Sequence, residues 1–265
     1  MASGSELSGT FDKVSSAYDK MRPGYPYELY QMIFSYVHIS ENSRVVEVGS
    51  GTGQATGPIL AKGCKLTAVE YGENLSALLR EKYKGYSNLN VVTGKFEDIA
   101  FEENAYDLVF SATAFHWIPE EKGYSKVFSM LRSGGAFARF ANRPFPCRGD
   151  EGLAREIDDI YSEYYYKYYD KKHDAPSVFS EEQASDIAAV AGRYGFTDIR
   201  YHLFSRERIF SAEEYIGLLG TYSDHIAIEK SIREKFFSKI KAAIERHGGS
   251  ITIYDTLDLE LARKP

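Results

Sequence analysis

The stretch VVEVGSGTG at residues 45–53 decides the fold of this 265-residue chain. Its first residues, with Arg44 in front of them, form a short apolar run that is rich in β-branched side chains, which is typical of a buried strand. Three glycines then follow at alternate positions. Without side chains, they allow the backbone to turn sharply and to approach a ligand closely. The stretch therefore predicts a strand that leads into a glycine turn.

The residues after this turn predict a helix and a second strand. A helix is expected over residues 54–63, where Gly63 ends it, and a strand over residues 65–70. Glu70 closes that strand and is expected at the carboxyl edge of the sheet, beside the glycine turn. Open α/β sheets bind nucleoside ligands at this edge, and a carboxylate there can accept both hydroxyl protons of a ribose.

Strands and helices continue to alternate along the chain, which predicts an α/β fold with a doubly wound, mostly parallel, seven-stranded sheet. Two late strands are expected to form an antiparallel edge, and a break at residues 143–146 precedes a helical cap that is inserted after the fifth strand. The later strands are expected at residues 89–93, 106–111, 136–141, 199–204 and 251–261. The expected organisation is a flexible lead-in (1–10), an α/β core with an N-terminal flap (11–142), a helical cap (143–198) and closing strands with C-terminal helices (199–265).

Composition narrows the class of protein. A formal net charge of −6 argues against a nucleic-acid partner, and no apolar run approaches the roughly 20 residues of a membrane span. Cys64 and Cys147 show no metal-binding spacing, and two lone cysteines fit a reducing compartment. The start of the chain lacks the layout of a secretory signal. We therefore expect a cytoplasmic protein, monomer or homodimer, that acts on a small molecule without a metal, a membrane or a nucleic acid.

Two cofactor classes use such a turn. A dinucleotide fingerprint, G-x-G-x-x-G, would need a third glycine where Gln54 or Thr56 stands, and it fits poorly. The pattern of Glu47 and the three glycines instead resembles motif I of the class I S-adenosylmethionine-dependent methyltransferases. Over residues 11–141 the chain resembles the ubiquinone-biosynthesis and trans-aconitate branch of that family. The resemblance implies a Rossmann-like sheet and S-adenosylmethionine as the cofactor.

The resemblance also implies roles for individual residues. Those expected at the cofactor are Glu47, Gly49, Gly51 and Gly53 around its methionine part and ribose, Glu70 at the ribose hydroxyls, Phe96 and Glu97 at the adenine, Ser111 beside the methyl-donor sulfur, and Tyr18 and Arg22 in the N-terminal flap.

Methyl transfer from a sulfonium is an in-line displacement, so the protein mainly has to align the reactants, an effect worth ~7–11 kcal/mol. A general base is needed only where the acceptor loses a proton. His116 and His225 are the candidates, and structural histidines bonded to a loop are the alternative. The residues expected in the substrate pocket are Tyr25, Phe115, Trp117 and Tyr165, for which ordinary packing is the alternative.

The predicted function is S-adenosylmethionine-dependent methyl transfer to an oxygen, nitrogen or carbon nucleophile of a small molecule. Two alternatives remain from the sequence. One is a protein that binds S-adenosylmethionine without transferase activity, and the other is a nicotinamide-dependent oxidoreductase.

Overall fold

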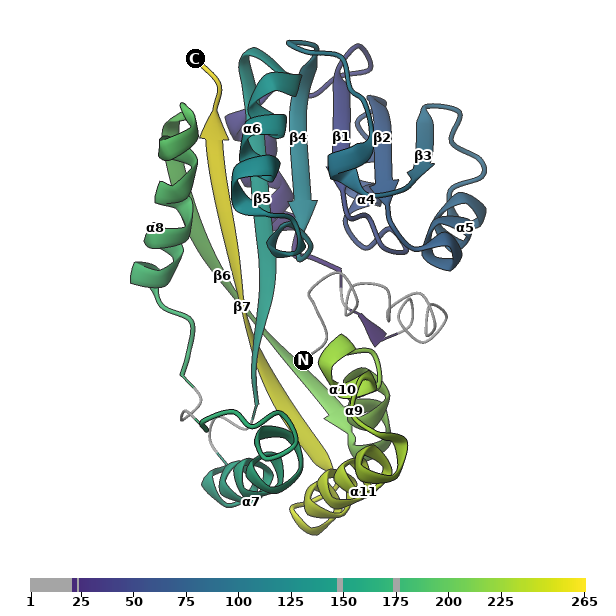
Figure 1. The fold of residues 1–265 in the computed structure, drawn as a ribbon, viewed down its shortest axis with the longest axis vertical. Helices are drawn as coiled ribbons and strands as arrows, with labels where there is room; N and C mark the ends of the chain where they lie inside the picture. The colour runs from purple at the N-terminus through teal and green to yellow at the C-terminus, as the bar shows by residue number, and fades with distance from the viewer. Residues whose placement is uncertain (1–20, 23, 147–149, 174–176) are drawn as a thin grey trace. The chain divides into compact units, whose positions relative to one another are not determined.

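In a computed structural model that describes residues 21–22, 24–146, 150–173 and 177–265, seven strands form a sheet in the order β3-β2-β1-β4-β5-β7-β6 (Figure 1). The chain order of the strands differs from this spatial order, as expected where helical crossovers connect parallel strands. The strands are β1 (Arg44–Val48), β2 (Lys65–Glu70), β3 (Leu89–Thr93), β4 (Tyr106–Ala112), β5 (Leu131–Pro146), β6 (Thr197–Ser211) and β7 (Ser250–Arg263).

Strands β1 to β5 pair in parallel, with Val46 opposite Thr67 in β2 and Val109 in β4. The last strands reverse direction. The backbone N–H of Gly134 donates to the carbonyl of Lys264, 2.9 Å away, so the start of β5 lies beside the end of β7. The sheet is therefore mostly parallel with an antiparallel edge, and the predicted fold class is confirmed.

The chain divides into two compact units, and neither is a continuous segment. The sheet unit comprises residues 23–142, 179–204 and 257–265, and the helical unit comprises residues 1–22, 143–178 and 205–256. These boundaries differ from the expected ones, because residues 179–198 belong to the sheet unit and residues 205–256 to the helical unit. Strands β5, β6 and β7 contribute residues to both units.

The break predicted at residues 143–146 is wrong, since β5 continues to Pro146. Proline removes a backbone donor and is tolerated in a strand only where that donor has no ladder partner. Pairing of β5 with β4 ends at the pair of Ala112 and Phe140, so both prolines lie beyond the last β4 partner.

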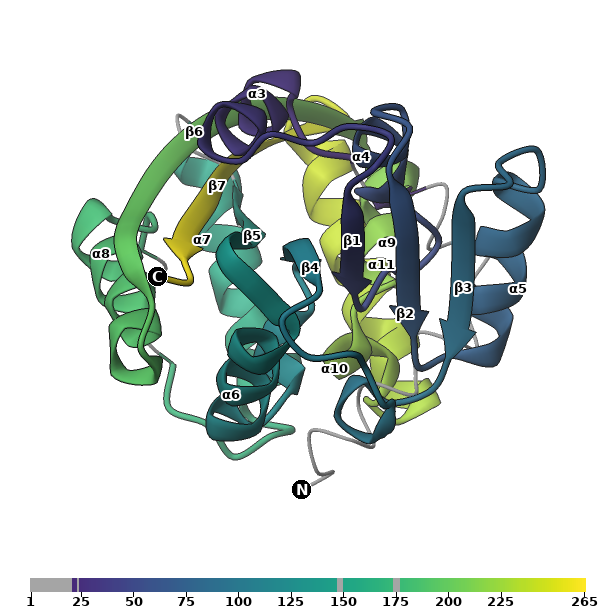
Figure 2. The ribbon, with the colours of Figure 1, turned by 90° about the horizontal axis from the view of Figure 1, so that it is seen from above.

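Helices cover both faces of the sheet within the sheet unit, and Figure 2 shows α3 and α6 on opposite sides of the strands. Alternate strand residues face the two layers. Val45 packs with α3 and α4, whereas Val46 packs with α6 and η5. The helical segments of this unit are α3 (Tyr27–Tyr36), α4 (Thr56–Leu60), α5 (Glu73–Lys82), η2 (Phe96–Asp98), η3 (Phe115–Trp117), α6 (Glu120–Met130), α8 (Glu181–Ala189) and η5 (Val190–Tyr194).

The helical unit has a hydrophobic core of its own, in which Leu153, Leu218 and Phe236 are buried. The helix predicted at about residues 151–172 forms as α7 and continues into a π-helical turn, η4. Asp150 caps α7 by accepting a hydrogen bond from the Leu153 N–H. The helical segments are α7 (Glu151–Tyr161), η4 (Ser162–Tyr166), α9 (Ala212–Leu219), α10 (Ser223–Ile226) and α11 (Lys230–Arg246).

Within the described part of the chain, no helix combines the length and the apolar character that crossing a membrane requires.

Candidate functional site

The glycine turn follows β1 in the sheet unit, and its three glycines have φ angles of +70°, +56° and +87° at Gly49, Gly51 and Gly53. Residues that carry a side chain rarely adopt this left-handed backbone conformation. A Cβ at Gly49 would lie 2.4 Å from the Ala114 Cβ, and one at Gly53 would lie 2.7 Å from Leu79. At these two positions the protein's own packing requires glycine, in addition to any close approach of a ligand.

Glu70 stands at the end of β2 and is 8% exposed. Its Oε2 accepts a hydrogen bond of 2.7 Å from the N–H of Gly51, and its Oε1 accepts one of 2.8 Å from the N–H of Gly72. The structure therefore brings the strand-end acid and the glycine turn together. The two backbone donors fix the orientation of the carboxylate.

Glu47 lies near the end of β1 and is 1% exposed. Its Oε2 accepts a 2.6 Å hydrogen bond from the Thr56 hydroxyl, whereas its Oε1 has no hydrogen-bond partner among the described residues. Burial raises the pKa of Glu47 to about 8; the Thr56 hydrogen bond opposes this shift and the Glu70 charge adds to it. An unpaired buried oxygen at this place is suited to a donor from a ligand.

The end of β4 lies beside the turn through Ser111, which is buried and donates its hydroxyl proton to the Val48 carbonyl over 2.8 Å. Two residues later Thr113 has a φ of +53°, which is unusual for a β-branched side chain. Its hydroxyl lies 2.7 Å from the Tyr25 hydroxyl and accepts a 3.2 Å hydrogen bond from the Asn142 N–H. Tyr25 is thus held against the end of β4.

The short turn η3 follows directly. Phe115, expected in the substrate pocket, is 4% exposed and packs on Phe137 and Tyr124 in the core of the sheet unit. His116 is exposed and its ring centroid lies 4.8 Å from that of the half-buried Trp117. Of these three residues, His116 is therefore the most exposed and Phe115 the most buried.

The turn predicted to bind adenine is η2, in which Phe96 is buried and Glu97 is half-buried. Lys126 of α6 holds this turn, because its Nζ donates to the carbonyls of Glu97 over 2.9 Å and of Ile99 over 2.5 Å. Burial lowers the pKa of Lys126, and the charges of Glu97 and Asp98 oppose this shift. No motif in the sequence indicates this contact.

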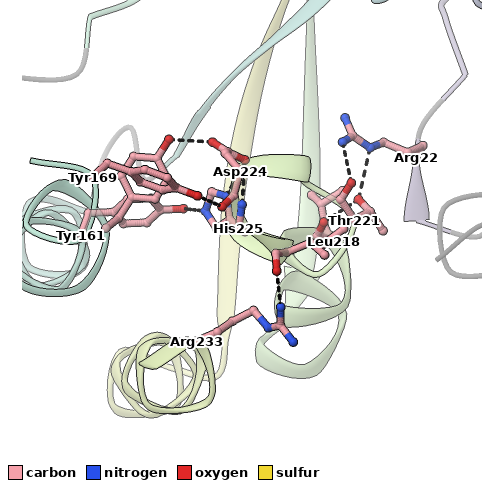
Figure 3. Close-up of polar contacts among 10 residues, drawn as sticks. Arg22, Tyr161, Tyr169, Leu218, Thr221, Asp224, His225 and Arg233 are labelled. Atoms are coloured by element: carbon pink, nitrogen blue, oxygen red, sulfur yellow. Dashed lines mark hydrogen bonds and ion pairs between the residues drawn. The ribbon is translucent and has the colours of Figure 1, made fainter. Parts of the chain in front are cut away.

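Arg22, expected at the cofactor, belongs to the helical unit (Figure 3). Its Nε donates to the Thr221 hydroxyl over 3.1 Å and its Nη2 to the Thr221 carbonyl over 3.0 Å, while the guanidinium lies 4.5 Å from the ring centroid of Tyr222. Tyr18 lies outside the described residues.

His225 is also in the helical unit, where it is 4% exposed (Figure 3). Its Nδ1 lies 2.9 Å from Asp224 Oδ1 and its Nε2 lies 3.0 Å from the Tyr161 hydroxyl, so both ring nitrogens are engaged. Tyr165 donates its hydroxyl proton to Asp224 Oδ2 over 2.7 Å. Burial alone would raise the pKa of Asp224, but the hydrogen bonds from His225 and Tyr165 and the His225 charge lower it well below its usual range.

Known proteins resemble the chain in both sequence and fold. Residues 46–138 match a family model described as a methyltransferase domain. An uncharacterised methyltransferase-like protein of Schizosaccharomyces pombe is 27% identical over 233 residues, which are 87% of this chain and 84% of that protein.

Two solved structures share the fold. A protein from Anaeromyxobacter dehalogenans that is assigned as a type II methyltransferase has a structure that superposes with a TM-score of 0.61. The two chains are 18% identical, and the match covers 91% of this chain and 97% of that one. Phosphoethanolamine N-methyltransferase 2 of Haemonchus contortus, solved with phosphomonomethylethanolamine and S-adenosylhomocysteine, superposes with a TM-score of 0.59 at 15% identity, over 100% of this chain and 61% of that one. The matched family model, the relatives and the shared fold agree with one another, and together they support a class I methyltransferase that uses S-adenosylmethionine.

Proposed function

We propose that this enzyme transfers the methyl group of S-adenosylmethionine to an oxygen, nitrogen or carbon nucleophile of a small molecule. The observation that carries the proposal is the glycine turn between two buried strand-end acids, one of which has an unpaired oxygen. The sulfonium of the cofactor supplies an already activated methyl group. The residues of the chain then have to bind, orient and exclude water.

The residues of the turn fit the cofactor. Glu70 is already oriented by two backbone donors, and its carboxylate is proposed to accept the ribose hydroxyls. The unpaired Oε1 of Glu47 is suited to the ammonium group of the methionine part, since a cationic donor would satisfy a buried carboxylate. Phe96 and Glu97 in η2 are proposed to contact the adenine, on a turn that Lys126 holds in place.

His116 is the proposed base for acceptors that lose a proton. It is exposed on η3, directly after β4, whereas His225 is buried with Asp224 and Tyr161 on its two nitrogens. We infer that His225 orders the tyrosines of the helical unit instead of meeting a substrate. Trp117 and Tyr25 are the proposed pocket residues, because neither ring is fully buried.

The oxidoreductase alternative conflicts with a specific contact. A dinucleotide turn needs a glycine in the third place for close packing of helix on strand. Thr56 stands in one of the two candidate places, and its hydroxyl is bonded to Glu47. The turn is thus built around an acid and a hydroxyl that a dinucleotide fingerprint does not contain.

An acceptor screen tests the proposal. The enzyme is incubated with S-adenosylmethionine and panels of phenols, carboxylic acids and amines, and mass spectrometry follows both S-adenosylhomocysteine and methylated product. We expect product in one panel, with cofactor turnover that depends on the acceptor. Binding of S-adenosylmethionine without product in any panel would favour a binding protein. Binding of a nicotinamide cofactor in its place would contradict the proposal.

Replacing His116 by Gln separates the two histidines. For an acceptor that loses a proton, we expect kcat to fall about 100-fold or more in His116→Gln, which is the usual contribution of a general base. For a carboxylate acceptor, which carries no proton to lose, kcat should stay unchanged. Equal activity of wild type and variant on a phenol would remove His116 from the mechanism.

A further inference from the structure

Glu47 Oε1 and the Tyr30 hydroxyl are buried oxygen atoms of the sheet unit that have no hydrogen-bond partner among the described residues. Each side chain is 1% exposed. Folded proteins rarely leave buried polar atoms unpaired, because each such atom has lost its water without compensation. The pair therefore points to a partner that is present in another state of the protein.

The two side chains come from different elements and interact electrostatically. Tyr30 lies on α3, where its ring packs edge-on against Phe140 with 6.3 Å between centroids. Burial raises the pKa of Tyr30, and the charges of Tyr25 and Glu47 add to that shift. The Tyr30 hydroxyl therefore lies within electrostatic range of Glu47, and the two groups make no hydrogen bond with each other in this structure.

No cation balances a charge on Glu47 within the described part of the chain. The groups that act on it are the Thr56 hydroxyl near α4, the Glu70 carboxylate on β2 and Tyr30 on α3. An ionised carboxylate that is buried without a cation, beside a second carboxylate, is strongly disfavoured. These surroundings favour the neutral acid, in line with the raised pKa of Glu47.

We propose that Glu47 holds a proton in the cofactor-free protein, that it releases this proton when the cofactor binds, and that the Tyr30 hydroxyl then donates to the ionised carboxylate. The inference rests on the proposed placement of the cofactor's ammonium group at Glu47. The O–H bond of Glu47 breaks and its proton passes to the buffer. Glu47 Oε1 then accepts a hydrogen bond from the ammonium, which keeps its own protons, so charge and atoms balance.

Tyr30 is a positioning residue in this scheme, since it acts through Glu47. Its hydroxyl makes no hydrogen bond with any residue that the structure describes, so the fold does not depend on it. A donor is needed only once Glu47 is ionised. The scheme therefore predicts that loss of the hydroxyl weakens cofactor binding without weakening the fold, which a merely structural tyrosine would not do.

Calorimetry measures the proton directly. S-adenosylhomocysteine is titrated into the full-length protein at pH 6.5 in buffers of different ionisation enthalpy, and the buffer dependence of the heat gives the number of protons released. We expect close to one proton for the wild type and close to none for Glu47→Gln, which also binds more weakly. Binding by the wild type without proton release, or equal release by Glu47→Gln, would overturn the inference while leaving the proposed function intact. Failure of the wild type to bind at all would contradict the proposed function itself.

Two matched tyrosine variants on α3 test the second part of the proposal, in which the Tyr30 hydroxyl donates to the ionised Glu47 carboxylate. Tyr30→Phe should bind S-adenosylhomocysteine roughly tenfold more weakly, as expected for loss of a hydrogen bond to a charged group, with an unchanged or higher Tm. Tyr36→Phe is the control, because the Tyr36 hydroxyl donates to the Asp198 carbonyl over 2.8 Å. It should lower the Tm and leave affinity unchanged. Wild-type affinity in Tyr30→Phe, or a fall in its Tm like that of Tyr36→Phe, would remove Tyr30 from the scheme.

Discussion

The Glu70 carboxylate accepts hydrogen bonds from two backbone N–H groups, and it is also proposed to bind the ribose of the cofactor. Glu70→Ala removes a charged acceptor, and hydrogen bonds to charged groups are worth ~1.5–3 kcal/mol each. We expect cofactor affinity to fall at least about tenfold, since 1.4 kcal/mol corresponds to a factor of ten. Isothermal calorimetry with S-adenosylhomocysteine measures the change.

Glu70→Gln is the matched control for that experiment. It keeps one acceptor oxygen and the shape of the side chain but removes the charge, so its affinity should lie between those of wild type and Glu70→Ala. A folded Glu70→Ala protein with wild-type affinity would remove Glu70 from the cofactor site.

Gly49 is required by packing as well as by its backbone, since an added Cβ would lie 2.4 Å from the Ala114 Cβ at a φ of +70°. Gly49→Ala should cost at least about 1–2 kcal/mol of the free energy of unfolding. For a chain of this size the Tm should fall by at least about 2 °C. Gly85→Ala is the control, because nothing lies within 4 Å of the added Cβ, and its Tm should stay unchanged. Equal melting of the two variants would contradict the packing argument.

The residues of the site were predictable only where the chain order reveals them. Glu70 could be singled out because it closes a strand, and Glu47 because it belongs to the recognisable pattern around the glycines. Tyr30, Thr113 and Lys126 were missed, because their contacts join residues that lie far apart in the chain and belong to no motif. The burial of Phe115 could not be predicted for a related reason, since an aromatic residue next to a strand end can face either the core or a cleft.

The turn η2 depends on a neighbouring helix, since the Lys126 ammonium of α6 bonds two of its carbonyls. Lys126→Met keeps the length of the side chain but removes both hydrogen bonds. We expect faster hydrogen exchange at residues 96–99 and several-fold weaker cofactor binding. Lys122→Met, on the exposed side of α6, is the control and should change neither. Unaltered exchange in Lys126→Met would show that the turn η2 is stable without the two hydrogen bonds from Lys126.

The contact between α10 and the tyrosines of α7 and η4 has a predictable pH dependence through Asp224. Its pKa is lowered in the folded protein, so the stabilisation is present above the unfolded value of about 3.9 and is lost as the pH falls below it. Asp224→Asn should therefore melt lower than wild type at pH 7, and the gap should narrow below about pH 4. A gap that is independent of pH would mean that the charge contributes nothing.

Strands with a clear pattern of apolar residues were predicted well, and β1 and β2 match their expected residues. The ends of long strands were not, because β5 and β6 extend beyond their apolar runs. Residues 143–146 show the reason. Proline ends a strand only when its missing N–H would have had a partner, and a single sequence does not show where the neighbouring strand stops.

The helical unit is assembled from separated segments, and so is the sheet unit, whose core includes Phe196, Leu259 and Leu261 from the last third of the chain. The match to the methyltransferase domain, residues 46–138, covers only part of that unit. We expect a fragment of residues 23–142 to be unable to fold alone, because it lacks β6 and β7 and exposes the apolar surface that they cover. Circular dichroism should show no cooperative melting of the fragment. A sharp transition would mean that β1 to β5 suffice.

The division of the chain into a sheet unit and a helical unit could not be predicted from the sequence. The helical cap was expected as one insertion, but residues 205–256 complete it from beyond the next strand. Amphipathic periodicity shows that a helix has a buried face and does not show which core receives it. That assignment depends on contacts such as those of Phe236 with Tyr161 and Tyr164, across some seventy residues of chain.

Thr113, just after the end of β4, has a strained backbone conformation. A β-branched residue with a left-handed backbone is strained by about 1–3 kcal/mol, and the surrounding contacts have to sustain it. Those contacts include the hydroxyl of Tyr25 and the N–H of Asn142. If either contact opens, Thr113 can relax toward extended geometry and carry Ala114, which packs on Gly49, with it. A displacement of the Tyr25 segment would therefore be transmitted through the backbone to the glycine turn, without any rearrangement of the sheet.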